Sequence, residues 1–86
     1  MNRAGRARLS IDQPVRYRIE LQGCLDPSWA EDVSGLAITV AHPEHGPAVT
    51  TLIGPLADQA AVLGVLNLVF SLGLPLLSVN YLGRAE

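Results

Sequence analysis

The sequence predicts a single small α+β domain, in which one long helix packs on one face of a four-stranded, mainly antiparallel sheet. Two observations predict this class. Four segments of strand character are separated by turn residues, and one apolar segment of helical length follows the third strand. With 86 residues, the chain is long enough for one domain only. The predicted order is strand, short helix, strand, strand, helix, strand.

The first part of the predicted domain contains a strand and a short helical connection. Apolar and polar residues alternate over residues 15–22, which predicts a strand with one buried and one solvated face. Residues 26–35 begin with an aspartate and a proline and end with a glycine, which are preferred residues for the start and the end of a helix. We therefore expect one or two helical turns there, with Trp29 folded onto the core.

A hairpin follows this connection. Residues 36–41 and 48–53 have strand character, and the link at residues 42–47 is short and contains glycine and proline. The Gly-Pro pair at residues 54–55 is expected to end the second strand of this hairpin.

The long helix and a last strand complete the domain. Asp58 places a negative charge in the first turn of the helix, and Gly73 is the expected left-handed stop, so the helix is predicted over residues 58–72. Residues 76–82 form the last strand, with Leu77, Val79 and Tyr81 on one face. The predicted boundaries are a flexible tail at 1–13, the domain at 14–83 and a second tail at 84–86.

Two strand orders fit this succession of elements. One is the ferredoxin-like split βαβ arrangement, in which the 26–35 connection crosses over to a parallel strand. The other is a meander of the first three strands. We favour the meander, because the first helix looks too short for a parallel crossover.

The long helix is more apolar than a single sheet requires. A helix over one open sheet needs an apolar arc of somewhat more than ~100°, and the arc of this helix is roughly twice as wide. Leu63 and Phe70 flank the face that should meet the sheet on one side, and Ala61 and Leu68 flank it on the other. No charged residue follows Asp58 within the helix.

Three interpretations compete for this surplus apolar surface. We favour a contact with another copy of the chain, made by Leu63, Leu68 and Phe70, because large exposed apolar patches mark interfaces. In the second interpretation, the 26–35 connection covers the flank and the protein is a monomer. In the third, residues 60–77 span a membrane, although polar and helix-breaking residues interrupt that run.

The composition narrows the classes of partner and compartment. Hydrophobic residues make up 49% of the chain and charged residues 16%, which is typical of a folded domain. The net charge of −2 predicts no nucleic-acid partner and makes an acidic membrane surface unfavourable. A single cysteine and a start without a secretory pattern predict a cytoplasmic protein.

The candidates for chemistry are weak. His42, Glu44 and His45 could in principle hold a metal ion, but they occupy the predicted hairpin tip, where a solvated loop is the simpler interpretation. Cys24 lies near acidic residues and has no neighbouring base in the sequence, so we interpret it as a small buried side chain. We therefore predict no catalytic residue, no cofactor and no metal.

Several blocks of the sequence together resemble a family of short, uncharacterised bacterial proteins. The blocks are G-x-L-D-P-S-W at 23–29, G-L-x-I-T at 35–39, G-P-x-x-D-Q-A-A-x-x-G-x-L at 54–66 and L-G-L-P-L-L-S-V at 72–79. The resemblance covers about residues 17–79 and implies a soluble, compact domain without an assigned activity. Such proteins often carry arginine and acidic residues late in the helix, where this chain has Leu68, Phe70 and Ser71. This departure favours an additional apolar contact in this chain.

These observations favour a small structural or regulatory interaction module over an enzyme. The expected partner is a second copy of the chain, most simply in a homodimer, or another protein. One alternative is a small-ligand sensor in which two protomers enclose a site between sheet and helix. Another is a single-pass membrane-associated protein. An enzyme with His42, Glu44 and His45 as metal ligands comes third, behind the interaction module and the sensor.

Overall fold

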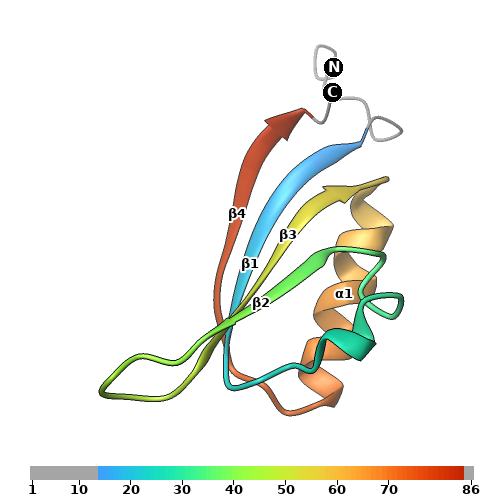
Figure 1. Cartoon of the computed structure of the whole chain (residues 1–86). Coiled ribbons are helices and arrows are strands. Elements are labelled where there is room, and N and C mark those ends of the chain that lie inside the picture. Colours follow the sequence, from blue (N-terminus) through green and yellow to red (C-terminus); the bar gives the residue numbers. More distant parts are fainter. Residues whose placement is uncertain (1–13, 85–86) are drawn as a thin grey trace.

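The computed structural model describes residues 14–84, which form four strands and one long helix (Figure 1). The elements follow one another as β1 (Val15–Gln22), the single 3-10 turn η2 (Pro27–Trp29), β2 (Ala37–Ala41), β3 (Val49–Leu56), α1 (Gln59–Ser71) and β4 (Leu76–Arg84). The strands form one antiparallel sheet with the helix on one face, which confirms the predicted α+β class. The tail predicted at residues 1–13 lies outside the described residues.

The strand order in the sheet is β2-β3-β1-β4. Since β1 and β2 are both antiparallel to β3, they run parallel to each other with β3 between them. This is the order of the split βαβ arrangement. The preference for a meander was wrong, because a meander would place β2 beside β1. The whole link from Gly23 to Leu36 makes the crossover, and its full length, rather than that of its short helical turn, meets the requirement of a parallel connection.

The crossover begins with a capped helical turn. The backbone N–H of Ser28 donates a 2.8 Å hydrogen bond to the Asp26 carboxylate, which is the predicted N-cap. Further along, Val33 is fully buried, and Trp29 packs half-buried against the core, as expected. Ser34 has a left-handed backbone with φ 60°, which is uncommon for a residue other than glycine.

A buried hydroxyl group ties the start of the crossover to the centre of the sheet. The Thr50 side chain in β3 donates a 2.6 Å hydrogen bond to the carbonyl oxygen of Gly23. It also accepts a 3.1 Å hydrogen bond from the backbone N–H of Leu25. Because Thr50 is fully buried, these two contacts satisfy polar groups that water cannot reach.

The strand β3 continues through the Gly-Pro pair that was predicted to end it. Beyond Ile53, the partner β2 has ended, so the last part of β3 has a free side where Pro55 can lie without an N–H donor. Gly54 is buried with φ 149°, and a Cβ atom placed there would lie 3.2 Å from Cδ2 of Leu36. The glycine therefore lets Leu36 pack directly onto the strand.

The helix α1 begins and ends at the predicted residues within one position. The Asp58 carboxylate accepts a 2.9 Å hydrogen bond from the N–H of Ala61, and Gly73 with φ 76° follows the C-cap Leu72. Val65 and Val69 are buried on the sheet-facing side. The core lies between this side, the crossover and the sheet, and consists of Ile19, Leu21, Leu25, Val33, Leu36, Leu52, Leu56, Val65 and Val69.

The strand β4 forms one edge of the sheet and pairs with β1. It ends at Arg84, two residues beyond the predicted end of the strand, so Arg84 does not belong to a tail. Its pairing with β1 contains two register shifts, each of which leaves one extra residue on β4, at Leu77 and at Leu82. The longest stretch of uninterrupted pairing therefore covers residues 78–81.

Candidate functional site

The large apolar side chains that remain exposed within residues 14–84 come only from α1, its C-cap and β4. Leu63 and Phe70 on the helix are 62% and 59% exposed, and Tyr81 on β4 is 55% exposed. We define the open face as these three side chains together with Leu77 and Val79 of β4. Leu72 and Leu82 are exposed at its margins.

The part of the open face on β4 belongs to the helix side of the sheet. Tyr81 lies opposite Tyr17 of β1, and Val79 lies opposite the fully buried Ile19. The rings of Tyr17 and Tyr81 meet edge to face with their centres 6.1 Å apart. These side chains have the alternation of a buried face, yet they are exposed because α1 packs against β3 and does not extend over β4 (Figure 1).

The two flanks of α1 have different neighbours. The crossover lies beside β2, and its Ser34 shares the lining of a pocket with Ala61, which places the crossover on the Ala61 flank of the helix. Leu63 and Phe70 lie on the opposite flank of the helix, which therefore points towards β4. The open face thus combines a helix flank with the inner side of an edge strand.

Leu68 differs from the two residues with which it was predicted to form an interface. It lies on the same flank as Ala61, is half-buried and packs against the core. Leu63 and Phe70 are exposed. The structure brings these two together with β4, which sequence reasoning did not include. The signal for β4 was its apolar alternation without charge, but its exposure depends on the strand order.

The open face is free of charge over a long stretch of sequence. No charged residue occurs from Gln59 to Gly83, so α1 and all of β4 except Arg84 are uncharged. The polar side of β4 points the other way, where the Ser78 hydroxyl donates a 2.8 Å hydrogen bond to the carboxylate of Glu20. Exposed apolar surfaces of this kind are typical of protein or lipid contacts.

The predicted metal candidates do not converge. His42, Glu44 and His45 are exposed in the link between β2 and β3, which extends away from the sheet and the helix (Figure 1). Within residues 14–84, no group of three or more such side chains is arranged to hold a metal ion. Cys24 was expected to be buried, but it is exposed, because it follows the strand end where the chain leaves the sheet.

One carboxyl group has a shifted acidity. The hydrogen bond from the backbone N–H of Ser28, together with one from its side chain, lowers the pKa of Asp26 below its ordinary value of 3.8. Asp26 is the cap of the crossover, so this shift reflects local helix capping and does not indicate a catalytic acid.

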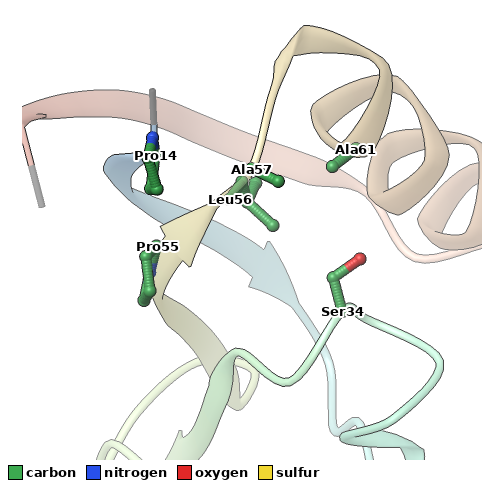
Figure 2. Close-up of a pocket in the computed structure, with 6 residues that line it drawn as sticks. All are labelled: Pro14, Ser34, Pro55, Leu56, Ala57 and Ala61. Carbon is green, nitrogen blue, oxygen red and sulfur yellow. The ribbon is translucent and has the colours of Figure 1, made fainter. Parts of the chain in front are cut away.

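A shallow pocket lies where the crossover approaches the start of α1. Figure 2 shows Ser34 of the crossover opposite Ala61 of the helix, and the cavity has a volume of about 320 Å³. This volume is at the lower end of the range for small-molecule sites. The lining is mainly apolar and without charge, and consists of Pro14, Ser34, Pro55, Leu56, Ala57 and Ala61.

The residues from 60 to 77, which we considered as a membrane span, are divided between α1, a turn and the start of β4. Among the residues that the structure describes, no helix is both long enough and apolar enough to cross a membrane.

The fold and the open face define a small α+β domain with exposed apolar side chains on its helix and edge strand. The chain belongs to a family described as a domain of unknown function (DUF8691), whose model matches residues 16–80. This match agrees with the resemblance to an uncharacterised family, while the individual sequence blocks and the bacterial source stay predictions. No curated protein matches the chain, and no solved structure matches it.

Proposed function

We propose that this protein is a small non-catalytic interaction module that self-associates as a homodimer through the open face. The observation that carries the proposal is the exposure of Leu63, Phe70 and Tyr81 on two elements that carry no charge between residues 59 and 83. A domain of this size buries a modest fraction of its surface, so a partner that covers apolar side chains adds stability that the core alone supplies weakly.

The size of the surface agrees with this proposal. From the exposed fractions of its side chains, the open face and its margins offer on the order of 500 Å² of apolar area. Patches of this size are at the upper limit for monomeric proteins and are often functional. We place the module in the cytoplasm, since a single exposed thiol, Cys24, suits a reducing compartment.

The mass of the purified protein in solution tests the proposal. Light scattering after size exclusion should give twice the 9.1 kDa of one chain. The double variant Leu63→Arg with Phe70→Glu should give a folded single chain, because both changes place charges in the interface. A matched control, Ala37→Arg with Thr39→Glu on the outer face of β2, should stay dimeric. A wild-type mass of one chain at all concentrations would refute self-association.

A small-ligand sensor is the second candidate function, and the pocket beside Ala61 favours it. An uncharged pocket of about 320 Å³ suits a compact, mainly apolar ligand. A thermal-shift screen with such metabolites should then raise the Tm of the wild type. The variant Ala61→Leu, which fills the pocket, should remove that shift. If no compound in the screen raises the Tm, the sensor is rejected and the interaction module remains as the proposed function.

A further inference from the structure

We propose that the dimer is reciprocal: the α1 flank of each copy packs over the β4 strand of the other. This inference rests on the proposed self-association and specifies its geometry. The open face contains both parts that such a contact needs, a helix flank with Leu63 and Phe70 and an uncovered strand with Val79 and Tyr81. A twofold interface uses the same patch on both copies, so a patch with two complementary halves can pair with itself.

The area and the charge of the open face favour a second copy as the partner. Two copies would bury on the order of 1,000 Å² of apolar side-chain surface, which reaches the lower size of specific interfaces. Since residues 59–83 carry no charge, two identical faces meet without repulsion and without burying an ion.

Of the two orientations of a twofold axis in the plane of the sheet, only the one along the strands produces this contact. The helix lies towards β3 and β4 lies at the far edge of the sheet (Figure 1). Rotation about an axis that runs along the strands moves the partner's helix over β4 and keeps the ends of the two sheets level. Rotation about an axis that runs across the strands would place helix on helix and leave both β4 strands uncovered.

The position of each side chain along the strand direction, which we call its height, then determines which residues meet. α1 starts near the end of β3, where Leu56 lies opposite Val15, and advances about 1.5 Å per residue, whereas a strand advances about 3.3 Å. Leu63 is therefore level with Tyr17 and its β4 neighbour Tyr81. Phe70 lies seven residues further along the helix, about 10 Å lower than Leu63. The reciprocal dimer pairs Leu63 of one copy with Tyr81 of the other.

A charge-pair experiment tests this geometry. Leu63→Arg and Tyr81→Glu are made in separate chains, and circular dichroism establishes that each is folded. Each variant alone should dimerise at least about 30-fold more weakly than wild type. An equimolar mixture should recover the dimer, because a heterodimer has one arginine–glutamate contact and one wild-type contact. The mixture of Phe70→Arg with Tyr81→Glu should recover less, since those positions lie at different heights.

The other outcomes separate this inference from the proposed function. A dimeric wild type whose single variants stay dimeric, or whose mixture shows no recovery, would overturn the reciprocal geometry and leave self-association standing. A wild type that is monomeric but sediments with phosphatidylcholine vesicles would overturn both and identify a lipid contact.

Cross-linking provides a second readout with smaller side-chain changes. In a Cys24→Ser background, chains with Leu63→Cys and chains with Tyr81→Cys are mixed and treated with a short bis-maleimide. The expected product links the two different chains. A product that links two Tyr81→Cys chains instead would show that the β4 edges pair directly and would overturn the proposal. Thr39→Cys on the outer face is the control and should not cross-link.

Discussion

The two flanks of α1 are both apolar, but they have different surroundings. Ala61 and Leu68 on one flank are half-buried, and the crossover lies beside that flank. Leu63 and Phe70 on the other flank are exposed, because β4 is an edge strand and the helix packs against β3. The comparison teaches that apolar residues on a helix do not by themselves predict burial. The path of the neighbouring chain decides it.

The largest expected effect contrasts Leu36, on the side of the core that the crossover covers, with Leu63 on the open face. We call the covered side the closed side. Leu36→Ala should lower the free energy of unfolding by about 2–5 kcal/mol, because Leu36 is buried between the crossover and β3. Leu63→Ala should change the stability of the single chain by less than about 0.5 kcal/mol. Urea unfolding at concentrations where the mass is that of one chain measures both. Equal losses would show that Leu63 is as tightly packed as Leu36 and that the helix flank beside β4 is not open.

A smaller loss is expected when the crossover is detached from the sheet. Thr50→Val keeps the shape of the side chain but removes both hydrogen bonds to the start of the crossover. The free energy of unfolding should therefore fall by about 1–3 kcal/mol. Thr51→Val is the matched control, since that side chain lies on the other face of β3 and should have little effect. A neutral Thr50→Val would mean that apolar packing alone holds the closed side.

Two glycines should respond to the same substitution in opposite directions. Gly54→Ala should destabilise the protein by about 1–2 kcal/mol, because its Cβ would press on Leu36 and its backbone has a positive φ. Gly64→Ala should stabilise it by about 0.5–1 kcal/mol, since nothing lies within 4 Å and alanine favours the helix. Thermal unfolding compares the two, and a loss at Gly64 would reveal a contact on the exposed side of the helix.

The smallest expected effect is a pH dependence at the start of the crossover. Because the folded state lowers the pKa of Asp26, its carboxylate contributes stability above the ordinary value of 3.8 and loses it as the pH falls through the lowered value. Asp26→Ser keeps a capping oxygen without the charge, so its stability should fall less than that of the wild type on acidification. Unfolding followed from about pH 6 to about pH 2 measures this difference, and identical curves would exclude the effect.

Local pattern predicted the elements well, because it records which side of a strand or helix is apolar. The bounds of β1 agree with its alternation, and α1 agrees with its cap and its glycine stop. The extension of β3 through Gly54 and Pro55 escaped prediction, since it depends on where β2 ends and on the packing of Leu36.

The candidate site was predicted only in part, for a related reason. Leu63 and Phe70 were identified because the helix had more apolar residues than one sheet can cover. The contribution of Val79 and Tyr81 could not be read from alternation, which assigns them to the inner face without saying that the helix fails to reach them. That information lies in the strand order, which the meander prediction had wrong.

The two register shifts of β4 have a consequence for the handling of this protein at high concentration. Fibril-forming segments are typically six or seven residues of regular, uncharged strand without proline. β4 has the composition of such a segment, but its ladder with β1 is interrupted at Leu77 and at Leu82, so its longest uninterrupted stretch, residues 78–81, is shorter than such a segment. The bulges therefore limit growth of open-ended β-aggregates at an edge that carries no protective charge before Arg84.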